Sequence, residues 1–450
     1  MNFKQLKSRR DFLRYGCRTI STLGAAAAFG QAGLVSAKAA TTGSSDYKAL
    51  VCIFLFGGND ANNLLIPTDS TNYPIYKSVR QNLAIAQGSL VQLGTTNFGL
   101  HPSLAPISPL FGAKRVALVA NVGTLVTPVT RGTGGVLAGT LPVNLFSHSD
   151  QQTEWQNAYP QGGADSNTGW AGRLADKIVS GGSLPPAIGI GGSALQLVGE
   201  NTQPAGISLS GFSLLAPSTD PGSAALQNML SIKGGPTLVQ AAQYSLTDAM
   251  SVAAAVDTAV NNSASLGVTF PNSDIGTQLG QVAKMIQVRA SLGATRQIFF
   301  CNQGGFDTHS NQLPQQAQLF GNLAAALVAF DQAMQGLGVT GSVTTFTESE
   351  FSRTFQPNGN AGTDHAWGSH HIVMGGAVQG GQIYGSFPTL ALSGPSDSGN
   401  RGNWIPTTST DQYSAALANW FGLASGDVTY VFPNLSIKGI GSPLGFMGPS

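Results

Sequence analysis

The chain is poor in charged residues and lacks long apolar runs, and both features limit the classes of protein to which it can belong. Of its 450 residues only 10% are Asp, Glu, Lys or Arg, so Gly, Ser, Thr, Asn and Gln provide most of the polar surface. This composition is more typical of secreted bacterial proteins than of cytosolic ones. After residue 39 no segment offers the roughly 18 uninterrupted apolar residues that a membrane span needs. We therefore expect a mature chain without a stable membrane span.

The first 39 residues predict an export signal. The stretch from Ser8 to Arg14 (SRRDFLR) matches the twin-arginine pattern, an Ala/Gly-rich and weakly apolar segment follows, and Ala37-Lys38-Ala39 is an A-x-A cleavage site. We expect residues 1–39 to be removed after passage through the twin-arginine translocase, which exports folded proteins. Residues 40–450 would then be periplasmic or extracellular. A basic amphipathic helix and an uncleaved anchor are the alternatives.

Removing that segment changes the charge and the cysteine count. Residues 1–39 hold seven Lys/Arg and one Asp, so 15 basic and 20 acidic residues remain, a net charge of −5. This balance argues against a nucleic-acid partner. Cys17 is lost, and Cys52 and Cys301 stay within apolar runs. Buried cysteines on strands are more often unpaired, although the predicted compartment would permit a disulfide.

Short apolar runs alternate with helical patterns, which is typical of an α/β fold. The expected strands are 49–56, 115–122, 296–301, 343–347 and 371–376, and the expected helices are 226–260, 274–292, 313–337 and 410–421. Runs this apolar predict a mostly parallel sheet covered on both faces, a three-layer α/β/α sandwich. Residues 195–270 are rich in Ala, Ser, Gln and Gly and predict an inserted cap.

Histidine is scarce, yet four of the six histidines lie within 63 residues. Two motifs contain them, Asp307-Thr308-His309 and Asp364-His365 followed by His370-His371. Carboxylate oxygens and neutral imidazoles are ligands for zinc and related ions. Each motif adjoins a predicted strand, and strand ends in an α/β sheet meet in one crevice. We expect one or two divalent ions there, first zinc, with manganese or calcium as alternatives.

Each motif also has a structural interpretation. Asp60, after Gly57-Gly58-Asn59, can bind metal or cap the next helix. Asp307 and His309 point the same way if the backbone is extended, or Asp307 caps a helix. Of His370 and His371 one is expected to be a ligand and the other structural, and which is which stays open.

Residues for chemistry are harder to assign. Glu350 could orient a ligand or act as a base, and Arg353 could bind an anion, or the two form a structural pair. Candidate hydroxyl nucleophiles are Thr124, Thr127, Thr130, Ser147 and Ser149. Ser147 precedes His148, but adjacent residues on a strand point apart. We expect His101 to be structural.

Together these residues resemble the bacterial secreted family called domain of unknown function 1501. The resemblance is carried by the twin-arginine start and by blocks spanning nearly the whole mature chain: 56–67, 99–104, 306–309, 350–354, 362–365, 375–381 and 405–422. That family is similar to the alkaline phosphatase and sulfatase superfamily. The similarity implies an α/β/α sandwich with a one- or two-metal site at the sheet's carboxyl edge, and carries ligand roles to Asp60, Asp307, His309, Asp364, His365 and one of His370 and His371.

Two departures limit the resemblance. The spacing of Asp307 and His309 is shorter than is common in the superfamily, and Thr130-Arg131 and Ser147-His148 are separated by a Gly-rich insertion where the family runs through a Thr-Arg-Ser-His-like stretch. No sulfatase-type signature is present. We expect an exported metal-dependent hydrolase of phosphate or sulfate esters that uses a hydroxyl or water as nucleophile. The alternative is a non-catalytic secreted protein on the same fold that binds metal, a surface or a polysaccharide.

Overall fold

The computed structural model describes residues 46–159, 167–178, 180–182, 184–209, 221–232, 237–437 and 440–448. The predicted signal peptide lies outside these residues. The chain divides into two compact units, and the larger one contains residues 44–209 and 263–450. Helices α6 (Pro221–Ser231) and α7 (Thr237–Asn261) belong to the other. The cap expected at 195–270 stays a prediction, although residues 195–209 belong to the larger unit.

A nine-stranded sheet forms the centre of the larger unit, in the order β13-β5-β12-β11-β1-β10-β8-β9, with β14 beside β5. Its strands are β1 (Lys48–Leu55), β5 (Val116–Gly123), β8 (Ala187–Ile190), β9 (Ala205–Ile207), β10 (Arg296–Gln303), β11 (Val343–Glu348), β12 (Ser369–Gly375), β13 (Ile383–Gly385) and β14 (Thr408–Ser409). Strand β12 runs antiparallel to both of its neighbours, and the other pairings are parallel. The prediction of a mostly parallel sheet is confirmed, and all five predicted strands are present.

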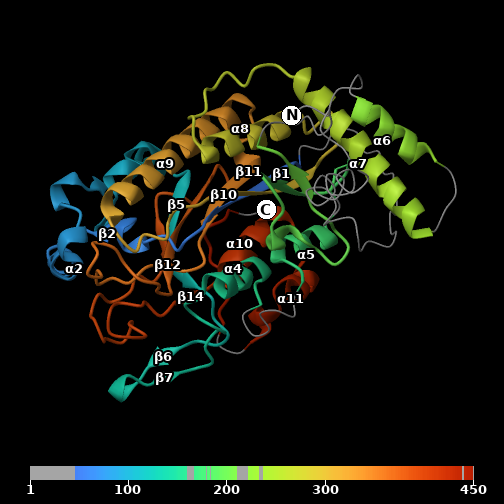
Figure 1. Cartoon of the computed structure of the whole chain (residues 1–450). Coiled ribbons are helices and arrows are strands. Elements are labelled where there is room, and N and C mark those ends of the chain that lie inside the picture. Colours follow the sequence, from blue (N-terminus) through green and yellow to red (C-terminus); the bar gives the residue numbers. More distant parts are fainter. Residues whose placement is uncertain are drawn as a thin grey trace, which may run out of the picture. The chain divides into compact units, whose positions relative to one another are not determined.

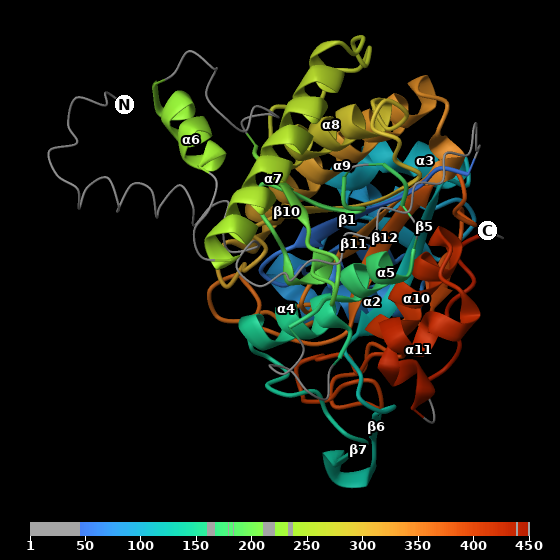
Figure 2. The same cartoon turned by 90° about the vertical axis from the view of Figure 1, so that its right-hand side faces the viewer.

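Helices cover both faces of this sheet, which confirms the three-layer arrangement (Figures 1 and 2). One face carries α8 (Asp274–Gln287) and α9 (Gln312–Gly336), and the other carries α4 (His148–Asn157), α5 (Trp170–Lys177), α10 (Thr410–Phe421) and α11 (Val428–Val431). The remaining elements are α2 (Asn72–Arg80), α3 (Ser108–Gly112), a small sheet of β2 (Leu65–Pro67), β4 (Phe98–Leu100) and β3 (Val91–Gln92), and a hairpin of β6 (Thr130–Arg131) and β7 (Leu137–Ala138). None of the helices in the described ranges is long and apolar enough to cross a membrane.

Local sequence explains the main elements. Strand β1 reads KALVCIFL and is buried along nearly its whole length, as a central strand between two helical layers must be. Helix α10 starts with a capping box in which Ser409 and Gln412 satisfy each other's backbone groups. It stops at Gly422, whose φ of 120° suits glycine.

The two cysteines are buried and unpaired. In the register of β1 and β10, Cys52 lies beside Phe300, whereas Cys301 lies beside Ile53. Side chains alternate between the faces of a strand, so the two thiols point to opposite sides of the sheet. The expectation that they are unpaired is therefore confirmed.

An ionisable group lies buried on the face of the sheet that α4, α5 and α10 cover. The carboxyl of Glu348 is fully buried and accepts a hydrogen bond from the Cys52 thiol at 3.5 Å. Burial raises its pKa to about 8. The proton therefore stays on Glu348 at neutral pH, where an exposed glutamate would have lost it.

Replacing Glu348 by Gln should change how stability depends on pH. The carboxyl titrates near 4.5 when unfolded and near 8 when folded, so within that window the folded state holds the extra proton and stability falls as pH rises. The slope is about 1.4 kcal/mol per pH unit, and Glu348→Gln removes it. Urea unfolding across this pH range should show the free energy of unfolding of the variant rising, relative to that of the wild type, by that amount per pH unit. The exposed Glu200→Gln is the control, and parallel slopes would contradict the assignment.

Candidate metal site

Topology brings the predicted motifs to one edge of the sheet. Loops that carry Gly57–Asp60, Asp307–His309 and Glu350–Arg353 leave the carboxyl ends of β1, β10 and β11, which run parallel. Because β12 is antiparallel to β11, the residues that precede it, including His365, reach the same edge. Helix α4 starts at His148, after β5 and the β6–β7 hairpin. Five segments distant in sequence therefore converge there.

A cluster of three histidines and one aspartate results. His148, Asp307 and His365 each offer a ligand atom, and these atoms lie within 4.8 Å of one another. The Nε2 atom of His309 adjoins them, 3.0 Å from an Asp307 oxygen and 3.1 Å from Nε2 of His365. We call these four residues the metal cluster.

Each imidazole of the metal cluster is oriented through its other nitrogen. Nδ1 of His148 lies 2.8 Å from Oε1 of Glu350, and Nδ1 of His365 lies 2.8 Å from the carbonyl oxygen of Phe146. Nδ1 of His309 lies 3.3 Å from Oδ1 of Asp364. Carbonyls and carboxylates only accept, so each Nδ1 donates and the neutral ring keeps a lone pair on Nε2. Metal-binding histidines are held in this way.

The cluster fits a divalent cation. Two Nε2 atoms 3.1 Å apart are held together by a proton or by a metal cation between them, and zinc bound to nitrogen at about 2.0–2.1 Å separates tetrahedral ligands by about 3.3 Å. Nε2 of His148 is buried and has no hydrogen-bond partner. Three imidazole nitrogens with one carboxylate are a donor set that suits zinc.

Two arginines lie beside the carboxylates of the site. Arg353, whose side chain is fully buried, donates to Asp307, and Arg401 donates to Asp364. Burial alone would raise the pKa of each aspartate, but the hydrogen bond and charge of its arginine outweigh burial and lower that pKa. Both carboxylates are therefore ionised at neutral pH, as metal binding requires.

Glu350 is ionised for a similar reason. Its buried Oε1 accepts from Nδ1 of His148, from Gln152 at 2.9 Å and from the backbone N–H of Gly57 at 2.8 Å. Burial opposes ionisation, yet these donors together lower the pKa of Glu350. Its hydrogen bond raises the pKa of His148, whereas desolvation lowers that of His365. Glu350 thus orients the His148 imidazole, which is compatible with its predicted role of orienting a ligand.

The loop after β1 passes close to the backbone of Asp307, which explains why residue 57 is a glycine. A Cβ atom on Gly57 would lie 2.3 Å from the backbone nitrogen of Asp307, and φ of Gly57 is 115°. Only glycine tolerates both the contact and this backbone conformation.

Asp60 differs from its prediction as a metal ligand, because the structure does not place it in the metal cluster. Its buried carboxylate accepts hydrogen bonds from Arg80 and Gln312, and one oxygen accepts from the backbone of Asn62 at 3.1 Å. With these donors around it, Asp60 has the structural role that was the alternative: it caps the short helix 61–63.

His370 and His371 also lie outside the metal cluster, within the buried strand β12. Nδ1 of His370 accepts from the backbone of Asn121 at 2.9 Å, and burial lowers its pKa to about 4. His371 packs between Trp155 and Tyr413, and burial lowers its pKa to about 3. The sheet keeps both rings neutral and enclosed. His101 caps a short helix as expected, through Ser103 N–H at 3.1 Å.

None of the five predicted hydroxyl nucleophiles hydrogen-bonds to the metal cluster in the described part of the chain, and Thr124 donates instead to Gln151 at 2.6 Å. Thr130 lies in the hairpin strand β6. Ser147 and Ser149 flank His148 at the start of α4, and their hydroxyls lie 3.1 Å apart.

The sequence did not predict His148 as a candidate ligand. The residue was singled out with Ser147, but a strand was assumed, whereas a helix begins there and its first turn reaches the sheet edge. Its place in the histidine-poor chain was the only available signal.

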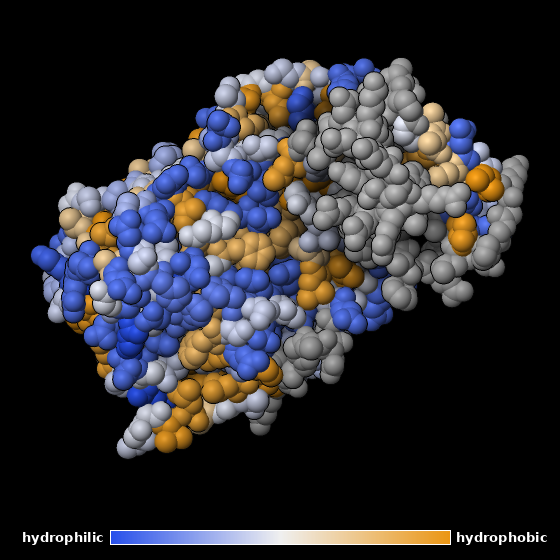
Figure 3. All heavy atoms as spheres, viewed as in Figure 1, coloured by the Kyte–Doolittle hydropathy of each residue, from blue (hydrophilic) through white to orange (hydrophobic). Residues whose placement is uncertain are grey.

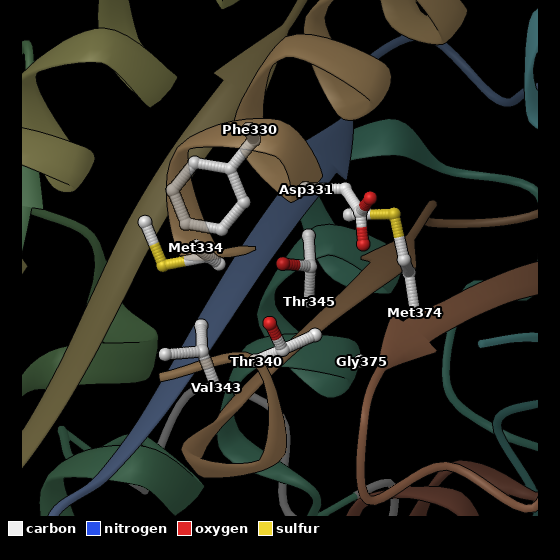
Figure 4. A pocket seen from close by; sticks show the side chains of 8 residues that line it. All are labelled: Phe330, Asp331, Met334, Thr340, Val343, Thr345, Met374 and Gly375. Atoms are coloured by element: carbon white, nitrogen blue, oxygen red, sulfur yellow. The ribbon is translucent and has the colours of Figure 1, made fainter. Parts of the chain in front are cut away.

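A separate cavity lies away from this site. Its lining comes from α9 and from the ends of β11 and β12 opposite to the metal cluster: Phe330, Asp331, Met334, Thr340, Val343, Thr345, Met374 and Gly375 (Figure 4). Asp331 there pairs with Arg115 at 2.9 Å. We assign it no role in metal binding.

Loss of the buried Arg80–Asp60 pair should be costly. Both side chains are fully buried, so Arg80→Ala leaves a carboxylate buried without its cation, which costs about 3–5 kcal/mol. The matched control, Lys177→Ala, removes the partly exposed 3.5 Å pair with Asp427 and should cost under about 1 kcal/mol. Urea unfolding measures both. Equal losses of stability in the two variants would show that the buried carboxylate of Asp60 does not require Arg80.

Several solved structures are similar to this chain at low sequence identity. Ps i-CgsB in complex with k-i-k-neocarrahexaose is 8% identical, with 77% of this chain and 70% of that chain covered and a TM-score of 0.32. PsFucS1 sulfatase from Pseudoalteromonas sp. is 9% identical, with 85% and 70% covered and a TM-score of 0.31. The phosphonate monoester hydrolase of Agrobacterium radiobacter is 8% identical, with 78% and 72% covered and a TM-score of 0.31. At these TM-scores we rest no argument on the similarity.

No match was found among curated proteins. A family model described as "Protein of unknown function (DUF1501)" matches residues 47–398, which is most of the chain and includes the whole metal cluster. The sequence blocks had already indicated this family. The chain belongs to the DUF1501 family.

Proposed function

We propose that the protein is an exported metal-dependent hydrolase of phosphate or sulfate esters. The observation that carries the proposal is the metal cluster: Nε2 of His309 and of His365 face each other at 3.1 Å beside Asp307, while each Nδ1 is engaged by an acceptor. Such an arrangement favours a bound cation. Export through the twin-arginine translocase is part of the proposal and is supported by the sequence of residues 8–39.

A divalent ion held there would polarise an ester oxygen and lower the pKa of a bound water. Around it, Glu350 and Asp364 keep the imidazoles of His148 and His309 oriented. Arg353 places a buried guanidinium 3.5 Å from Nε2 of His309, a ring that is about half exposed. An anionic ester bound at His309 would therefore lie beside this guanidinium, which also donates to Asp307.

We propose water as the nucleophile, in preference to a hydroxyl. The hydroxyls of Ser147 and Ser149 hydrogen-bond to each other and not to a cluster residue. A hydroxyl nucleophile would be expected within reach of the ion and of the charge on Arg353. Single Ser147→Ala and Ser149→Ala variants should therefore keep turnover within about threefold of the wild type.

Removing one imidazole should remove the metal and the activity together. We expect His365→Ala, purified without chelator, to lose its metal by elemental analysis. It should also lose about a thousandfold in kcat/KM on 4-nitrophenyl phosphate or sulfate, because ion polarisation contributes several kcal/mol to such reactions. The matched control is His101→Gln, whose carbonyl oxygen can still accept the Ser103 N–H.

Two results would count against the proposal. Equal metal content in His365→Ala and His101→Gln would contradict the site. Metal bound stoichiometrically to the wild type without turnover of any ester would favour the alternative, a non-catalytic secreted protein that binds metal for stability or to hold a surface or polysaccharide.

A further inference from the structure

An uncharged, apolar surface adjoins the metal cluster. Among the described residues of the larger unit, six large apolar side chains are exposed, and four of them lie between residues 136 and 146: Val136 (70%), Leu141 (40%), Val143 (47%) and Phe146 (42%). We call these four the apolar strip. No Lys, Arg, Asp or Glu occurs from residue 132 to 149. Exposed apolar groups concentrated in this way mark binding surfaces.

The fold does not use the side chains of the apolar strip. Neighbouring residues of the same segment, Leu137 and Leu145, pack against a small core that includes Val129, Trp367 and Ile405. The strip residues remain at the surface: Val136 lies between β6 and β7, and the other three follow β7. The β6–β7 hairpin projects from the body of the larger unit, and hydrophobic residues gather in this part of the surface (Figures 1 and 3). Burial in the chain's own core therefore does not explain their apolar character.

The strip is held in place at several points. The backbone N–H of Thr140 donates to the Thr127 hydroxyl at 2.7 Å, and the carbonyl of Val143 accepts from Gln151 at 3.1 Å. The carbonyl of Phe146 accepts from Nδ1 of His365, so the strip ends at a ligand of the metal cluster. These contacts fix the segment that carries the strip, and its Phe146 end adjoins the metal cluster.

We propose that the apolar strip binds the organic part of the substrate, and that this part is an alkyl or aryl group. The inference rests on the proposed function. A substrate whose anionic ester lies at the metal cluster, next to Arg353, has its organic group directed along the chain segment that leaves Phe146. An apolar group is the only chemistry that this uncharged surface stabilises.

Other occupants fit less well. An anionic lipid surface attracts Lys and Arg, but Arg131, the only Lys or Arg in the sequence from residue 123 to 149, donates to the carbonyls of Asp397 and Gly399. A second copy of the chain would cover the strip without explaining why it ends at His365.

The test is equilibrium binding of butyl, hexyl and octyl phosphate to the metal-loaded protein by calorimetry. We expect Kd to fall about two- to fourfold per added methylene. In the variant Val136→Ser/Leu141→Ser/Val143→Ser, which leaves Phe146 and all ligands intact, octyl phosphate should bind at least about tenfold more weakly while butyl phosphate changes little. The control is Ile75→Ser, an apolar residue exposed elsewhere, in α2.

Several outcomes would overturn the inference. A Kd independent of chain length, or the same chain-length dependence in the triple variant, would show that the strip does not bind the organic group. The inference would also fail if the strip served another partner. In that case the wild type would bind vesicles of phosphatidylcholine with phosphatidylglycerol, or would form a dimer by light scattering, and the triple variant would lose that property. If the chain-length dependence holds but no ester is cleaved, the proposed function fails and the binding surface stands.

Discussion

The site depends on the hydrogen bonds that fix the far nitrogen of each cluster imidazole. Glu350, Asp364 and the carbonyl of Phe146 come from three separate segments, and each turns one Nε2 toward the same point. These acceptors and the ring contacts with Phe351 together restrict His148 and His365, and the carboxylate of Asp364 restricts His309. The acceptors thus convert side chains from distant loops into one donor set.

Charge is scarce in this chain and is concentrated where the strands end. Arg353 and Arg401 each neutralise an aspartate of the site, and Arg80 neutralises Asp60 just beneath it. Their proximity places several ionised groups within a largely uncharged protein. At Glu348, by contrast, burial dominates and raises the pKa, so the carboxyl stays protonated below about pH 8.

Sequence reasoning recovered the sheet because its strands are apolar on both faces, a pattern with few other interpretations. It also brought Asp307, His309, Asp364 and His365 to one edge, since strand ends meet there. It could not place Asp60, because nothing in the sequence reveals that Arg80, twenty residues later, folds back onto it. The direction of β12 was equally hidden, and with it the enclosure of His370 and His371. His148 was missed because a helix start and a strand look alike in so short a polar segment.

Strand β1 has a consequence for the order of assembly. It leaves the ribosome early, but its neighbours β10 and β11 begin at Arg296 and Val343. About 250 and 295 further residues must therefore be synthesised before these strands can pair with β1. Contacts this distant in sequence slow folding. The central strand, and the loop of Gly57 that supports Glu350, therefore reach their final geometry only after most of the chain has been synthesised. A protein that crosses the membrane already folded, as proposed here, has to complete this step in the compartment it leaves, and its choice of metal would be made there as well.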